Sequence, residues 1–194
     1  MSEPRSTVGE QPASLDAILR SALKGQYHGA LTMLRRAIEL CPDDLWVATN
    51  LGGAPFWRVA YHTLYYTHLY LMRDEHSFTP WKWHQTGLQD LDDIPAPPEL
   101  QDLLELPDRP RQTGVPYTRG EILAYWDICE RMVDADIDAL DVLNPDTGFS
   151  WHTPRRSKVE QHIDSIRHIQ HHTSQLAVRV RAATGDSVEW VASR

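Results

Sequence analysis

The chain is short of cysteine, of long apolar runs and of basic residues, and each shortage excludes a class of protein. Two cysteines, Cys41 and Cys129, cannot form the disulfide framework of a small secreted protein, and neither lies in a CxxC pair. No apolar run reaches the length of about 18 residues that a membrane span needs, and the N-terminus lacks a basic region followed by an apolar one. We therefore expect a cytoplasmic protein that is neither exported nor inserted in a membrane.

The shortage of basic residues argues against nucleic acid as a partner. Nineteen Lys and Arg residues stand against 27 Asp and Glu residues, which gives a net charge of −8. Phosphate binding depends on clustered cations that release counterions. Arg155, Arg156 and Lys158 do cluster, but we interpret them as solvated side chains before a helix. A Gly-rich phosphate loop and a Ser-His-Asp order are also missing, so nucleotide use and covalent serine chemistry have no support.

Aromatic residues and histidine, in contrast, are plentiful. The chain contains seven Trp, seven Tyr and ten His, and 41% of its residues are hydrophobic. A chain of this size can bury one sizeable core and needs no second domain. We therefore predict a flexible N-terminus over residues 1–13, a single helical domain over residues 14–185 and a C-terminal tail over residues 186–194.

Three segments before the last quarter of the chain have the pattern of helices. Ser14 could cap a helix that ends near Leu40, before Cys41 and Pro42. The segment 54–72 is apolar on nearly every side, so several neighbours should bury it. The segment 118–143 begins with Thr-Arg-Gly-Glu, which fits a capping box, and continues with an apolar stripe.

A long connection separates the second and third of these helices. Seven of the thirteen prolines interrupt residues 73–117: Pro80, Pro95, Pro97, Pro98, Pro107, Pro110 and Pro116. A short helix is predicted over residues 99–106, and the acidic residues at 90, 92 and 93 suggest a solvated turn. Connections of this length are often functional. Whether this one forms a lid over a pocket or simply packs on the body stays open.

The longest helix is predicted over residues 157–184, where neither proline nor glycine occurs and Gly185 provides the stop. Beside its apolar face runs a polar strip of Asp164, His168, His172 and Gln175. A histidine pair at positions i and i+4 places two imidazoles roughly 6 Å apart, close enough to hold one cation. This strip is the strongest sign of a functional site in the sequence.

Four long helices without a convincing strand predict an all-α fold, a four-helix bundle with a long irregular connection between the second and third helices. In such a bundle, His62 of the second helix could meet His168 and His172 of the fourth. The alternative is that His62 is a hydrogen-bonded core histidine, and the pattern of residues alone does not choose between them.

Two segments resemble the DinB-like (DinB/YfiT-type) family. RHIQHHTSQL, at positions 167–176, is similar to the pattern in the fourth helix of these proteins, and WRVAYH, at positions 57–62, is similar to their second-helix histidine motif. The resemblance implies an up-down-down-up bundle that holds a divalent metal with His62, His168 and His172. Asp164 stands where some relatives have another histidine, so it could be a fourth ligand or a hydrogen-bond acceptor behind the ligands.

The same comparison shows one departure from the family pattern. Many relatives have Arg-Gly where this chain has Thr173 and Ser174. The histidines are untouched by this change, but it leaves the activity of any particular subfamily open. Three neutral imidazoles would leave coordination positions open, as in a working site. Zinc and nickel are the first choices of metal, with iron and manganese as alternatives.

Two hypotheses about function follow. Some DinB-like relatives are similar to S-transferases that use low-molecular-weight thiols, so the first is a metal-dependent transfer of a thiol to a small electrophile, or hydrolysis of a small molecule by activated water. No catalytic residue is identified, although Tyr66 is a candidate for orienting the substrate. The second hypothesis is a non-catalytic metal-binding module for stress response or protein interaction. Homodimers are common among similar proteins, but no stripe of this sequence demands one.

Overall fold

The computed structural model describes residues 14–49, 53–91, 114–152 and 156–192, and these ranges contain helices and no strand. The helices are α1 (Leu15–Leu40), α2 (Asp43–Trp46), α3 (Phe56–Leu71), α5 (Arg119–Ala139) and α6 (Lys158–Thr184). The predicted all-α class is confirmed. The helix predicted over residues 99–106 lies outside the described ranges. Within them, no helix is at once long enough and apolar enough to cross a membrane.

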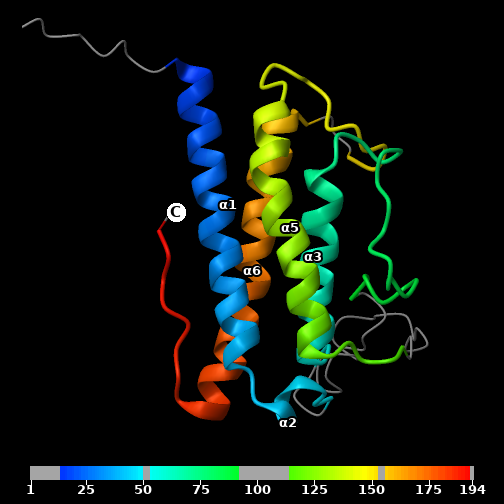
Figure 1. Ribbon diagram of the computed structural model, residues 1–194, viewed down its shortest axis with the longest axis vertical. Coiled ribbons are helices and arrows are strands. Elements are labelled where there is room, and N and C mark those ends of the chain that lie inside the picture. Colours follow the sequence, from blue (N-terminus) through cyan, green and yellow to red (C-terminus); the bar gives the residue numbers. More distant parts are fainter. Residues whose placement is uncertain (1–13, 50–52, 92–113, 153–155, 193–194) are drawn as a thin grey trace, which may run out of the picture.

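The four long helices lie side by side and share one core (Figure 1). Helix α1 packs against α5 and α6, and α3 packs against the same two helices. Each long helix therefore buries its apolar side between two neighbours. The largest fully buried side chains include Tyr27 of α1, Tyr61 of α3 and Tyr125 of α5. Much of the core is thus aromatic, as the composition suggested.

The ends of the helices follow the capping signals of the sequence. The Ser14 hydroxyl accepts a hydrogen bond from the first turn of α1. At the start of α5, Thr118 and Glu121 form both halves of the predicted capping box. Gly185 closes α6 with a φ of 83°, a left-handed conformation that glycine adopts at little cost. The prediction that the third helix ends near Leu143 is wrong. Helix α5 ends at Ala139, and the next residue, Leu140, has an extended backbone conformation and a buried side chain.

The connection after α3 packs on the body over its described part. Residues 72–91 run back along the outside of α3 (Figure 1). The Trp81 ring is stacked on the Tyr125 ring of α5, with centroids 4.6 Å apart, and Leu88 is buried. The described part of the connection therefore packs on the body. Residues 92–113 of the connection lie outside the described ranges.

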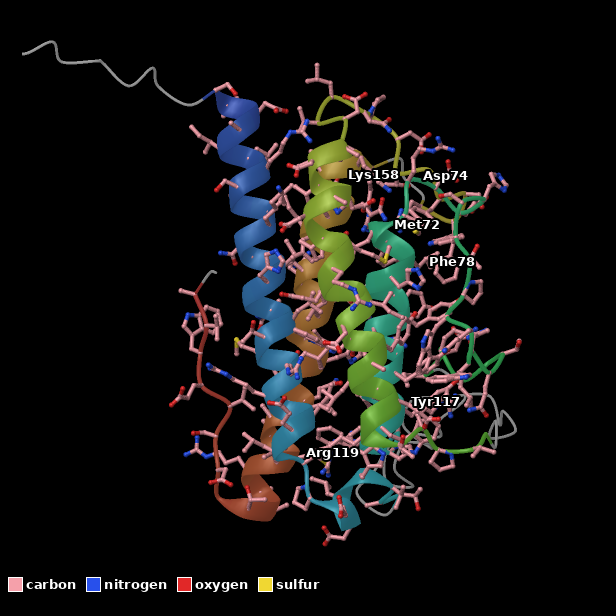
Figure 2. All side chains as sticks on the ribbon, viewed as in Figure 1. Met72, Asp74, Phe78, Tyr117, Arg119 and Lys158 are labelled. Atoms are coloured by element: carbon pink, nitrogen blue, oxygen red, sulfur yellow. The ribbon has the colours of Figure 1, made fainter. Side chains whose placement is uncertain are left out.

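One end of the bundle is joined by a buried cation. Figure 2 shows Lys158, at the start of α6, beside Met72 and Asp74 at the end of α3. The Lys158 ammonium donates to the carbonyl oxygens of Met72, Arg73 and Thr147 at 2.8–3.1 Å. The side chain is buried, and this burial lowers its pKa to about 8. The prediction that Lys158 is a solvated cation is therefore wrong, because three carbonyl oxygens take the place of water.

Helices α1 and α5 are joined by a histidine that binds two carboxylates. His28 of α1 contacts Glu130 through Nδ1 at 2.8 Å and Asp134 through Nε2 at 3.1 Å. Burial by itself would lower the pKa of His28, but the hydrogen bonds to Asp134 and Glu130 outweigh it and raise the pKa above its usual value. The protonated ring can donate from both nitrogens, so this contact is strongest when His28 is charged.

We expect His28 to stabilise the protein more in acid than in base. Because the pKa is raised in the folded state, the contribution is fully present below the unfolded value of about 6.5 and is lost as pH rises through the folded pKa. Denaturant unfolding of wild type and His28→Ala at pH 6 and pH 8 would measure this. The loss of unfolding free energy should be larger at pH 6 than at pH 8, and equal losses at the two pH values would contradict this role of the charged ring.

The capping box allows a second test. Thr118→Ala removes the hydroxyl that accepts from the Glu121 backbone N–H and should lower the free energy of unfolding by about 1 kcal/mol. Thr118→Ser keeps the hydroxyl and should lose much less. Urea unfolding of both variants measures the two values, and equal losses would contradict a capping role.

Candidate metal centre

Three histidines from two helices meet in the space between α3 and α6. The His62 Nε2 atom of α3 lies 2.9 Å from the His168 Nε2 atom and 3.1 Å from the His172 Nε2 atom of α6. One nitrogen from each ring lies within 4.8 Å of the others, and this is the group of possible metal-binding side chains found among the described residues. The structure thus brings together the three histidines that the sequence singled out.

The helix geometry explains why these side chains converge. His168 and His172 are one turn apart, so they project from the same side of α6. That side faces α3, which packs along α6 and contributes His62 from its middle. His172 is buried, and the other two rings are half-buried. Two regular helices therefore hold the cluster, and no loop supplies a ring to it.

In His62 and His172, a hydrogen bond at Nδ1 determines which ring nitrogen carries the proton and which presents a lone pair to the cluster. The His62 Nδ1 atom lies 2.6 Å from the backbone carbonyl oxygen of Gln89, and this oxygen can only accept. The proton of His62 is therefore on Nδ1, and its Nε2 atom presents a lone pair. The His172 Nδ1 atom lies 2.9 Å from the amide oxygen of Gln175, which has the same effect. These contacts resemble the supporting hydrogen bonds found behind metal-binding histidines.

The contact between His62 and His172 lacks a proton that would relieve the repulsion between the two Nε2 lone pairs, because both rings hold their protons on Nδ1. Burial lowers the pKa of His62 to about 4 and that of His168 to about 3, and it also lowers the pKa of His172. All three rings are consequently neutral at pH 7. Two acceptor nitrogens about 3 Å apart repel one another unless a positive charge lies between them. A neutral imidazole with its lone pair directed inward is also the form that binds a metal.

The spacing of the nitrogens fits a single cation. With metal–nitrogen bonds of about 2.0–2.1 Å, two nitrogens on one ion are roughly 2.8–3.4 Å apart for octahedral or tetrahedral angles. The distances from the His62 Nε2 atom to the Nε2 atoms of the other two rings, 2.9 and 3.1 Å, lie within this range. Small shifts of the side chains would complete the fit. The donor set, three imidazoles, suits zinc, nickel, iron and manganese.

The other candidates of the sequence lie outside this group. The Asp164 carboxylate is bound by Arg156 and, at 2.9 Å, by Arg167, so the structure does not bring it to the three rings. The Tyr66 ring lies beside His62, with centroids 4.9 Å apart, but its hydroxyl donates to Asp90 at 3.0 Å. His171 is exposed and does not belong to the group, but its Nε2 atom lies 3.2 Å from the amide nitrogen of Gln175, the residue that binds His172.

Some residues behind the histidines were not found from the sequence. Asp90 was assigned to a solvated turn, which is wrong, because it accepts from Tyr66 and from the Gln89 side chain. No sequence motif could identify the Gln89 backbone carbonyl as a partner of His62, since every residue has a backbone carbonyl. Arg58 did leave a signal, as the one formally charged residue in the apolar segment 54–72. A buried guanidinium needs several acceptors, and here they come from the connection after α3.

Comparison with protein-family models, with curated proteins and with solved structures finds no match to this chain. Membership of the DinB-like family is therefore not shown, and the resemblance of the two histidine segments stays a prediction. The function has to be inferred from the chemistry of the cluster. That chemistry is specific enough to test with single substitutions.

We expect His62→Ala to lower metal occupancy as much as His172→Ala does, because each ring supplies one of three nitrogens. Metal analysis of protein purified without a histidine tag would measure both. His76→Ala is the control, since the side chain of His76 is 90% exposed and lies outside the group of three rings, and it should leave occupancy unchanged. Full occupancy in His62→Ala would remove His62 from the site.

Proposed function

We propose that this chain binds a divalent metal ion through His62, His168 and His172. The observation that carries the proposal is the pair of short Nε2 contacts that bring three neutral rings to one point, two of which, His62 and His172, hold their protons on Nδ1 and direct lone pairs at each other. A divalent cation turns this repulsion into three favourable bonds. Zinc and nickel are the preferred ions, and iron and manganese are the alternatives.

We also infer that the four long helices form the up-down-down-up bundle of the DinB-like family. Two contacts support a parallel course for α1 and α6: Tyr27 pairs with His162, and Met33, further along α1, with Gln170, further along α6. The colours in Figure 1 run along α3 and α5 in the opposite direction. This order of directions, together with the histidine segments, is the support for the family assignment.

The first functional candidate is a metal-dependent enzyme that acts on a small molecule. A bound divalent cation supplies a Lewis acid that lowers the pKa of a coordinated thiol or water. The chain's own contribution is to hold three ligands and to leave the remaining positions free for reactants. A low-molecular-weight thiol transferred to a small electrophile fits this arrangement, and hydrolysis is the variant that uses water. Burial raises the pKa of Tyr66 well above its usual range, so its hydroxyl stays protonated and would donate to a substrate only in place of Asp90.

The second candidate is a metal-binding module without turnover. One observation favours it: Tyr66 and Asp164, the two further side chains that the sequence offered for the site, are already paired with other groups of the protein. The Tyr66 hydroxyl donates to Asp90, and the Asp164 carboxylate is bound by arginines. Among the described residues around the cluster, these groups are therefore not free to act as an acid or base. The metal would then stabilise the packing of α3 against α6 for a role in stress response or protein interaction.

The proposal also covers the location, the partners and the assembly of the protein. We place the protein in the cytoplasm, with a small molecule as its partner and without a nucleic-acid or membrane partner. The acidic balance, a net charge of −8, supports the exclusion of nucleic acid. A homodimer is the proposed assembly, on the resemblance alone.

The two candidates can be separated with the metallated protein. If the chain is an enzyme, a panel of low-molecular-weight thiols and small electrophiles should contain a pair whose reaction it accelerates. The double variant His168→Ala, His172→Ala is the control, and its rate should fall to that of the uncatalysed reaction. A wild-type rate no higher than that of the control across the panel would favour the binding module. Failure of the wild type to bind any divalent ion would refute both candidates.

A further inference from the structure

We propose that Arg58 is a positioning residue of the metal centre and sets its affinity through the backbone of residues 87–90. We call residues 87–90 the strap. This inference rests on the proposed metal-binding function, because it concerns how His62 is held ready for the ion. Arg58 is a buried residue of α3, and its hydrogen bonds to the strap do not involve the three rings. The inference is that it nevertheless contributes to the site.

Arg58 binds the strap through several hydrogen bonds to backbone carbonyl oxygens. Its Nε atom donates to the Leu88 carbonyl at 3.3 Å, and one terminal nitrogen donates to the carbonyls of Gly87 at 3.3 Å and Asp90 at 2.7 Å. The side chain is only 4% exposed. A buried guanidinium with fewer acceptors would be costly, so this set of contacts strongly favours one conformation of the strap.

The strap is held by three successive turns of α3. Arg58, His62 and Tyr66 are four residues apart, so they project from one face of the helix. Arg58 binds the carbonyls on either side of residue 89, His62 binds the Gln89 carbonyl itself, and Tyr66 binds the Asp90 carboxylate. The carbonyl that faces His62 is therefore fixed from both sides. Gly87 permits the turn, because its φ of 88° is unfavourable for other residues.

The position of the Gln89 carbonyl matters for the ion, since it keeps the His62 proton on Nδ1. If the strap moved away, the ring could carry its proton on Nε2 or rotate, and either change would remove one ligand. Arg58 therefore acts on the metal through the strap and His62. By linkage, a metal that prefers the fixed ring must in turn stabilise the strap. Metal binding and order in residues 87–90 should thus depend on one another.

The test is the affinity of the purified full chain for Zn²⁺, measured by competition with a chromophoric chelator. Arg58→Met should weaken binding about tenfold, in the range found when supporting residues of metal ligands are removed. Arg58→Lys, which keeps a donor, should lose less. Gly87→Ala strains the turn without touching α3 and should also weaken binding, which keeps the proposal testable if Arg58→Met does not fold.

Arg20→Met is the matched control for a merely structural role. Arg20 also bonds to backbone carbonyls, those of Ile137 and Asp138, but at the far side of the bundle from the strap. This variant should lower the unfolding temperature and leave the Zn²⁺ affinity unchanged. Amide hydrogen exchange of residues 87–90 supplies an independent measurement. Zn²⁺ should slow this exchange in the wild type and have a smaller effect in Arg58→Met.

The outcomes separate this inference from the proposed function. If the wild type binds Zn²⁺ and the folded variants Arg58→Met and Gly87→Ala bind it equally well, the positioning role is refuted and the metal site stands. The same holds if Arg20→Met weakens binding as much as Arg58→Met does, because the effect would then reflect stability alone. If the wild type does not bind Zn²⁺ or another divalent ion, the proposed function fails and this inference fails with it.

Discussion

The described structure depends most on the approach of three neutral imidazoles between α3 and α6. The acceptor nitrogens of His62 and His172, 3.1 Å apart, are unfavourable neighbours in a half-buried site, where water screens charges poorly. The contact survives because the surrounding helices pack well, although the Nδ1 hydrogen bonds of both rings leave no proton between the two Nε2 atoms. A positive ion is the simplest charge that makes such an arrangement favourable. The same interaction links a packing feature of the bundle to its chemistry.

The support of the site is distributed unevenly. On α6, His168 and His172 are held by a long helix with a side-chain cap at one end and a left-handed glycine at the other. On α3, His62 depends on a segment outside the helices, because its partner is a backbone carbonyl of the connection. A rigid pair of ligands and a third ligand tied to a connection form a site whose affinity can respond to that connection. This asymmetry is the physical basis for a link between loop order and metal binding.

Features that depend on residues nearby in the sequence could be predicted, and features that depend on distant parts of the chain could not. The helix starts at Ser14 and Thr118 followed from local capping chemistry, which acts within four residues. The end of α5 was placed too late, since burial of Leu140 in extended backbone depends on distant neighbours. Lys158 was taken for a solvated cation for the same reason: the carbonyl oxygens that bury it come from two other parts of the chain.

The sequence by itself determined the helical class, the position of the long last helix and the pairing of His168 with His172, because helical periodicity is a local property. It offered His62 as a third ligand only as one of two alternatives. The tertiary structure decided that His62 joins the pair, that Asp164 turns to arginines, and that a backbone carbonyl determines which His62 nitrogen faces the centre. These outcomes depend on how α3, α6 and the connection pack against one another. The pattern of side chains along the sequence does not determine the distances between such distant segments.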